Sequence, residues 1–216
     1  MAVDHLFSIP LGQYKLKNFA KHKKALINLL TDDYDEADDK NRKADNWKCN
    51  SFQTWLWGNG QEELVNDLYK YIDKYLIEFG FNSFSYKVES WFNIYGKQQY
   101  QERHGHCHSL IAGMVVLQYD PEQHTPLRFI NPYPEVARNF EKFDCQTTNF
   151  KFVNDSIPLT MEEGMIYLWP STLNHLVPPQ PNNCKDLRIT FTFNVNPDDQ
   201  WDNTFTRQQL TESQPV

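Results

Sequence analysis

The hydrophobic pattern of the chain changes once, at Gly80. Before this residue, two stretches, over residues 15–30 and 64–79, repeat apolar side chains at the period of an amphipathic helix. After it come only short runs rich in β-branched and aromatic residues, separated by Pro, Asn and Asp. We therefore expect two helices, the second ending at Gly80, with the acidic run Thr31 to Asp39 as a loop between them.

The runs after Gly80 predict about six to eight strands. The clearest runs cover residues 84–95, 112–120, 126–130, 150–154, 164–170 and 187–196. Helices followed by strands predict an α+β fold, a β-sandwich or jelly roll with the N-terminal helices packed on its outside. We expect residues 1–216 to form one domain, with a helical part at about 13–80, a β core at about 84–197 and a polar tail at 198–216.

The composition excludes several classes of function. A formal net charge of -7 provides no basic surface for nucleic acid. No apolar stretch has the length of a membrane span, and the N-terminus lacks the features of a secretory signal. The four cysteines lie far apart and predict free thiols, without a disulfide framework or a cysteine zinc site. We expect a cytoplasmic protein that does not associate with membranes.

Three histidines alternate in the segment QERHGHCHS, at His104, His106 and His108, and Glu102 precedes them by two residues. Alternate side chains of an extended strand share one face, so these four can all point the same way. Neutral imidazole suits iron, zinc, copper and nickel. Cys107 would point to the opposite face, which argues against a closed structural zinc site. The segment predicts an open metal site that needs a further ligand from elsewhere.

Two downstream histidines are candidates for that ligand. His124 lies in the proline-flanked segment PEQHTP, which predicts an exposed turn. His175 follows the apolar strand GMIYLWP and a Pro-Ser turn. Because a strand end holds a side chain more rigidly than a loop tip does, we expect His175 to be the distant ligand.

Residues 187–196 alternate strictly between apolar and polar side chains. Arg188, Thr190, Thr192 and Asn194 share the polar face. If that face lines the interior of a barrel, Arg188 can pair with a carboxylate ligand through its two-pronged guanidinium. Its position alone equally allows a strand face turned to solvent.

The order of these features resembles the Fe(II)- and 2-oxoglutarate-dependent oxygenases, in particular a family known from phages and marine bacteria. The resemblance spans nearly the whole chain. The segments that carry it are LFSIPL, SWFNIYGKQQYQERHGH, the Ala112-Gly113 pair, PLRF, GMIYLWPSTLNHLVPP and RITFTFNV.

The resemblance implies a double-stranded β-helix that uses Fe(II) and 2-oxoglutarate to hydroxylate an unidentified small-molecule or protein substrate with O2. It implies His104, His106 and His175 as iron ligands and Arg188 as the partner of the distal carboxylate of 2-oxoglutarate. It also implies cosubstrate contacts for Asn93 and Tyr95. His108 has no counterpart among the family's ligands, and we expect Glu102, His108 and Thr190 to lie around the ligands. Ser171 and Trp91 are expected to be structural. If the chain is viral, the expected location is the host cytoplasm.

The second residue of the histidine pair departs from the wider superfamily, in which a carboxylate usually occupies the position of His106. Three neutral imidazoles leave an Fe(II) site with two positive charges, which a dianionic 2-oxoacid neutralises; nickel, copper and zinc also become compatible. Two alternatives remain open. One is a cupin-like three-histidine enzyme that does not use 2-oxoglutarate, although HGHCHSLI lacks the usual cupin glutamate and Arg188 would have no role. The other is a non-catalytic, metal-stabilised binding or virion-associated module.

Overall fold

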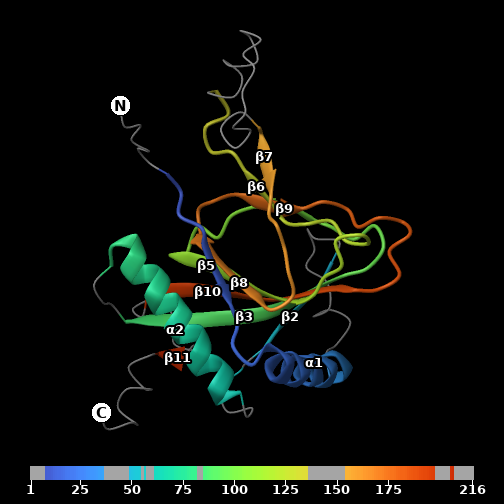
Figure 1. Cartoon of the computed structure of the whole chain (residues 1–216), viewed down its shortest axis with the longest axis horizontal. Helices are drawn as coiled ribbons and strands as arrows, with labels where there is room; N and C mark the ends of the chain where they lie inside the picture. The colour runs from blue at the N-terminus through green and yellow to red at the C-terminus, as the bar shows by residue number, and fades with distance from the viewer. Residues whose placement is uncertain are drawn as a thin grey trace.

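The computed structural model describes residues 8–36, 49–54, 56, 61–81, 85–135, 154–197 and 205–206. These residues form two antiparallel sheets and two helices (Figure 1). The helices are α1 (Phe19–Glu36) and α2 (Glu62–Phe79), and Gly80 ends α2 with a left-handed φ of 104°. Only glycine adopts such a φ without a Cβ penalty, so the predicted end of this helix is confirmed.

The larger sheet has seven strands in the order β1-β8-β5-β10-β3-β11, with β2 also paired to β3. At its centre, β10 pairs with β3 on one side and with β5 on the other. The strands are β1 (Gly12–Lys15), β2 (Asn50–Gln53), β3 (Tyr86–Tyr95), β5 (Ile111–Gln118), β8 (Met165–Pro170), β10 (Arg188–Pro197) and β11 (Phe205–Thr206).

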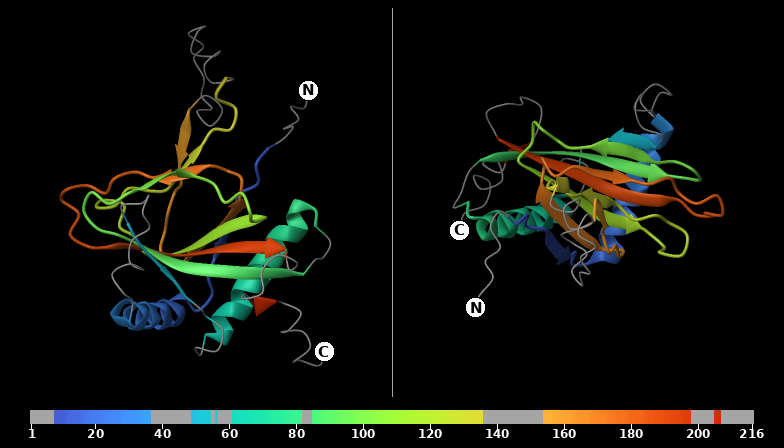
Figure 2. Two further views of the ribbon diagram at one scale, coloured as in Figure 1. Left: turned by 180° about the vertical axis from the view of Figure 1, so that it is seen from behind. Right: turned by 90° about the horizontal axis from the view of Figure 1, so that it is seen from above.

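The smaller sheet has four strands in the order β4-β9-β6-β7. It lies opposite one face of the larger sheet, whereas both helices lie on the other face (Figures 1 and 2). Its strands are β4 (Gln101–His104), β6 (Arg128–Ile130), β7 (Ser156–Pro158) and β9 (His175–Val177). The helices are therefore packed outside the sheet pair, as the sequence predicts.

Two apolar clusters fill the two sides of the larger sheet, because alternate residues of each strand point to opposite faces. In β5, Val115 and Leu117 belong to the cluster under the helices, whereas Met114 and Val116 belong to the cluster between the sheets. In β10, Phe191 and Phe193 pack toward the helices and leave the polar face of the strand turned toward the smaller sheet. The alternation predicted for residues 187–196 is confirmed, and its polar face is internal.

The sequence-based boundaries need three corrections. Helix α1 begins at Phe19 and continues to Glu36, so the first acidic residues of the expected loop are helical. The part expected to be helical, 13–80, also contains β1 and β2. Four residues of the expected strand 150–154 and the tail from Asp198, except for the short strand β11, lie outside the described residues.

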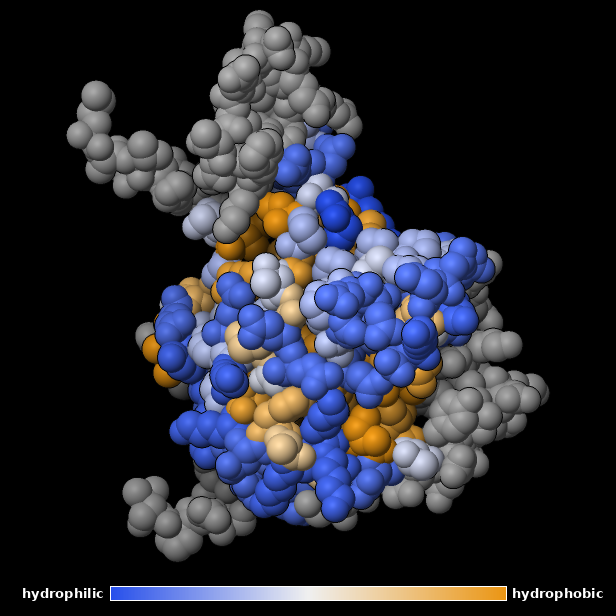
Figure 3. All heavy atoms as spheres, turned by 45° about the vertical axis from the view of Figure 1, so that its right-hand side comes forward, coloured by the Kyte–Doolittle hydropathy of each residue, from blue (hydrophilic) through white to orange (hydrophobic). Residues whose placement is uncertain are grey.

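Within the described ranges, neither helix is long and apolar enough to cross a membrane. On the face shown in Figure 3, hydrophilic side chains dominate and apolar ones form separate patches. Such a surface is ordinary for a folded domain, much of whose accessible area remains apolar.

Gly113 marks the closest packing in the larger sheet. A Cβ added there would lie 2.5 Å from Phe193 Cζ and 2.6 Å from Leu168 Cδ2, both from flanking strands. We expect Gly113→Ala to lower the free energy of unfolding by about 1–3 kcal/mol through overpacking, measured by urea denaturation. Gly96→Ala is the matched control, because its new methyl group would meet no atom closer than 3.6 Å. Equal stability of the two variants would contradict this packing.

Candidate functional site

Three imidazoles meet at the edge of the smaller sheet. His104 ends β4, His175 begins β9, and these two residues are register partners. His106 follows β4 by two residues, and its ring centroid lies 5.3 Å from that of His104 and 5.2 Å from that of His175. One ligand nitrogen of each ring lies within 4.8 Å of the others, so the group can hold a metal ion.

Backbone hydrogen bonds bring the distant His175 to the local pair. The amide of His106 donates to the carbonyl of Ser171, and the amide of Ser171 donates to the carbonyl of Leu110. The Ser171 hydroxyl adds a bond to the carbonyl of Ser109. Gly105 permits this close approach, since an added Cβ would lie 3.1 Å from Asn174 Oδ1. Ser171 therefore has the structural position expected for it.

Hydrogen bonds fix the tautomer of all three rings. Nδ1 of His104 lies 2.7 Å from the carbonyl oxygen of Glu102, and Nδ1 of His175 lies 3.0 Å from that of Leu173. Nδ1 of His106 lies 2.5 Å from Asn194 Oδ1. An oxygen of this type only accepts, so each Nδ1 must carry the proton and each Nε2 is the unprotonated nitrogen. This is the state in which histidine binds a metal.

Burial keeps the three imidazoles neutral. Desolvation is the main cause that lowers the pKa of His104 to about 4 and that of His175 to about 3; neighbouring rings of the triad contribute, against the opposing backbone hydrogen bonds at Nδ1. Desolvation also lowers the pKa of His106, against the opposing effect of Asn194. Protons therefore compete weakly with a metal ion at neutral pH.

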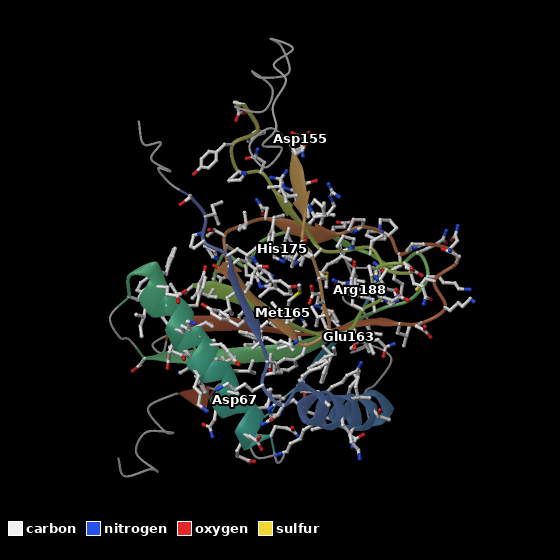
Figure 4. All side chains as sticks on the ribbon, viewed as in Figure 1. Asp67, Asp155, Glu163, Met165, His175 and Arg188 are labelled. Atoms are coloured by element: carbon white, nitrogen blue, oxygen red, sulfur yellow. The ribbon has the colours of Figure 1, made fainter. Side chains whose placement is uncertain are left out.

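A small inner pocket of about 10 Å³, roughly the space of one water molecule, lies beside the triad between the two sheets. The buried Arg188 lies in it, and Figure 4 shows both His175 and Arg188 in the space between the sheets. The guanidinium carbon lies 4.7 Å from the centroid of the Tyr95 ring, and Nη2 contacts Met161 Sδ at 3.5 Å. Its Nε and Nη1 have no hydrogen-bond partner among the described residues. Desolvation lowers the pKa of this guanidinium.

The other cosubstrate candidates line the same pocket. Asn93, Tyr95 and Thr190 are all buried there. The Asn93 amide is bound on both sides, since Oδ1 accepts from Ser51 and Nδ2 donates to Thr192. The Tyr95 hydroxyl donates to Gln101 Oε1 at 2.9 Å. The structure thus gathers the six residues expected to hold the metal and the cosubstrate, together with Thr190, around one cavity.

Four expectations change in the structure. His108 is exposed in a turn after the strand and does not contact the triad rings. The Glu102 side chain is exposed, and its backbone carbonyl is the group that meets His104. His124, expected to be exposed, is 4% exposed and accepts a bond from the amide of Asp120. Trp91, expected to be a core residue, stacks 5.8 Å from His106 and lines the pocket.

Sequence reasoning missed three residues of the site. Asn194 orients His106, Gln101 holds the Tyr95 hydroxyl, and Trp169 packs edge-on against His175 at 5.2 Å. The sequence pattern could have indicated Asn194, because this residue shares the polar face of its strand with Arg188. No sequence pattern indicated Gln101 or Trp169. Their roles depend on how two sheets, built from strands distant in the chain, face each other.

Residues 89–194 match the family model described as "Putative 2OG-Fe(II) oxygenase". This range contains both local histidines, His175 and Arg188. The chain contains a domain of the 2OG-Fe(II) oxygenase family. Its cofactor and cosubstrate are accordingly Fe(II) and 2-oxoglutarate, and the three-histidine group is compatible with the metal. No curated protein matches the sequence of this oxygenase significantly.

The fold of this oxygenase is similar to the folds of several solved structures. A prolyl-4-hydroxylase from Pseudomonas putida aligns at a TM-score of 0.60 with 12% identity, over 88% of this chain and 94% of that one. A viral collagen prolyl hydroxylase from Paramecium Bursaria Chlorella virus-1, in complex with 2-oxoglutarate, aligns at a TM-score of 0.51 with 11% identity, over 86% of this chain and 96% of that one. EctD from S. alaskensis, with 2-oxoglutarate and 5-hydroxyectoine, aligns at a TM-score of 0.54 with 13% identity, over 85% of this chain and 72% of that one.

The lowered histidine pKa values predict acid sensitivity of the metal-free oxygenase. Below the unfolded imidazole pKa of about 6.5, the unfolded chain binds more protons than the folded one, so stability falls as pH decreases toward about 4. We expect a loss of about 1 kcal/mol per pH unit for each buried imidazole, measured by urea denaturation across this range. His104→Gln should flatten the dependence, whereas His108→Gln should leave it unchanged. A flat wild-type profile would contradict the burial of neutral rings.

The hydrogen bond between Asn194 and His106 leads to a second prediction, which concerns metal affinity. Asn194→Ala removes the acceptor that fixes the His106 tautomer, so we expect Fe(II) affinity to fall about 10–100-fold. Anaerobic titration with Fe(II) measures this change. Asn183→Ala, at an exposed turn, is the matched control and should bind as the wild type does. Unchanged affinity in Asn194→Ala would remove Asn194 from the site.

Proposed function

We propose that the chain is a hydroxylase in which a double-stranded β-helix holds Fe(II) on His104, His106 and His175, and 2-oxoglutarate on Arg188. The two facing antiparallel sheets, with helices on the outer face of one, support the β-helix assignment. The similar folds of two prolyl hydroxylases support hydroxylation as the reaction class.

The observation that carries the proposal is the buried guanidinium of Arg188. It is 1% exposed, and two of its nitrogen atoms have no partner among the described residues. A charge removed from water without an opposite charge costs several kcal/mol, so a fold that retains one implies an anion that joins it. A carboxylate suits a guanidinium through two parallel hydrogen bonds. Because Arg188 and the triad line the same pocket, one molecule with carboxylates at both ends would bridge them.

The charges of the site favour a dianionic cosubstrate. Three neutral imidazoles leave the two positive charges of Fe(II) uncompensated and Arg188 adds a third, so the dianionic 2-oxoglutarate would offset two of the three. When bound, Fe(II) and 2-oxoglutarate supply the oxidative decarboxylation that activates O2 for hydroxylation.

The protein contributes position and exclusion of water to this chemistry. The hydrogen bonds at each Nδ1 hold the rings in the tautomer whose unprotonated Nε2 would bind the metal. Tyr95, locked by Gln101, packs its ring against the guanidinium, and Thr190 offers a hydroxyl beside it. The apolar Met114, Leu127 and Val177 close the pocket walls. Water is thereby kept from the cosubstrate.

We place this activity in the cytoplasm. The cysteines that the structure describes, Cys49, Cys107 and Cys184, are free thiols. A reducing compartment maintains thiols in this state.

Arg188→Met tests the proposal, because it keeps most of the side-chain volume and removes the charge. In the wild type with Fe(II), 2-oxoglutarate at about 100 times its Kd should raise the unfolding free energy by about 2.7 kcal/mol. In Arg188→Met this gain should vanish while Fe(II) binding persists. The metal-free variant should be about 1–4 kcal/mol more stable than the wild type, since a buried unpaired charge is gone. Thermal and urea denaturation measure these changes.

Two further variants complete the test. Arg128→Met is the control, because Arg128 bonds to Ser156 and does not line the pocket. His104→Ala should lose the metal and, with it, the visible charge-transfer band of the anaerobic Fe(II)–2-oxoglutarate complex. Full stabilisation of Arg188→Met by 2-oxoglutarate, or the absence of this band in the wild type, would refute the proposed cosubstrate.

A further inference from the structure

A second, wider pocket opens on the other side of the triad. His104 and His106 form part of its wall, and Trp91 lines both this outer pocket and the inner one. One side of the outer pocket is the continuation of the polar face of β3 and β10, and the other is the 105–109 segment. A molecule in the outer pocket therefore lies against the metal site from the side opposite Arg188.

Three residues of this wall, Asn196, Ser51 and Glu89, offer hydrogen-bond acceptors, whereas Trp91 Nε1 is a buried donor without a partner among the described residues. Asn196 is 2% exposed, and its Oδ1 has no partner among the described residues although it lines the pocket. The Ser51 hydroxyl already donates to Asn93, so its oxygen can only accept a further bond. Glu89 adds a half-buried carboxylate. An unpartnered buried acceptor implies a donor that arrives with a ligand.

The charge of the wall is negative. Among the described residues that line the outer pocket, Glu89 is the one with a permanent charge. Lys87, the next residue on this face of β3, is buried and is not among the lining residues. Trp91, two residues from Glu89 on the same strand face, presents an aromatic ring. A carboxylate beside a tryptophan is a combination that attracts cations, through ion pairing and cation–π attraction.

The two pockets are thus complementary to opposite charges. The inner pocket contains a buried guanidinium and suits a dianion, whereas the outer one contains acceptors, a carboxylate and an aromatic ring. This separation gives specificity, because an anionic cosubstrate is repelled by Glu89 and a cationic substrate is repelled by Arg188. The net charge of -7 also favours the approach of a cation.

We propose that the outer pocket binds the substrate to be hydroxylated and that this substrate presents an ammonium group to Glu89, Asn196 and Trp91. The proposal rests on the proposed function, since it takes the triad as the place of oxidation. An ammonium group has three donors and no acceptor, which matches the oxygen atoms of Glu89, Asn196 and Ser51. The free amine of a small molecule and the side chain of a lysyl peptide share this chemistry.

The test uses the full chain loaded anaerobically with Fe(II) and 2-oxoglutarate. Formation of the charge-transfer band is recorded first, and n-butylammonium, butanol or butyrate is then added. We expect n-butylammonium to perturb the band and to raise the melting temperature, and the neutral and anionic analogues to do neither at equal concentration. A blocked Ala-Lys-Ala peptide, compared with Ala-Gln-Ala, distinguishes a peptide substrate from a free amine.

Glu89→Gln is the decisive variant, because it keeps the shape and removes the charge. We expect it to form the band normally and to weaken binding of the cationic probe by at least about tenfold. Glu122→Gln, at an exposed turn outside the pocket, is the control and should bind as the wild type does. A normal band with no preference for cations, or with equal binding in Glu89→Gln, overturns the substrate proposal alone. A missing band overturns the proposed function beneath it.

Discussion

The strict alternation of strand β10 is the constraint on which the rest of the structure depends. One face of this strand carries Phe191 and Phe193, which are fully buried under the helices. The other face carries polar side chains that cannot enter an apolar core without partners. The smaller sheet meets this second face with histidines, and a polar pocket lies between the two sheets. A single pattern with a period of two thus forces both a core and a cavity.

Some polar groups around the site have hydrogen-bond partners within the protein and others have none. The first kind supports the site, and the second kind is available to bound groups. Asn93, Gln101 and the three imidazole Nδ1 atoms each have a fixed partner within the protein. His106 Nε2 and Arg188 Nε have none among the described residues, nor has Asn196 Oδ1 in the outer pocket. Because a buried polar atom without a partner is costly, these atoms mark where bound groups would complete the structure. The metal ligand lies between the anion partner in the inner pocket and the acceptor in the outer one.

Much of this site was accessible from particular residues. The segment with His104 and His106 indicated a metal because imidazoles seldom alternate by chance. The strand-end position of His175 indicated the third ligand, and the resemblance supplied the role of Arg188. Other positions depended on packing. Trp91 was expected in the core, where strand aromatics usually pack, yet its face of β3 turns toward His106. His124 was expected in solvent, yet hydrogen bonds to the amide of Asp120 and the carbonyl of Asp186 bury it.

The sequence by itself determined the helix end at Gly80, the two-faced strand at 187–196 and the residue types of the metal group, because each depends on local backbone preference or on periodicity. Only the tertiary structure decided that the polar face of β10 is internal, that His108 is left in an exposed turn, and that Asn194 reaches His106. These facts depend on how two sheets, built from strands distant in the chain, face each other. A one-dimensional pattern states which side chains share a face, but it cannot state what that face meets.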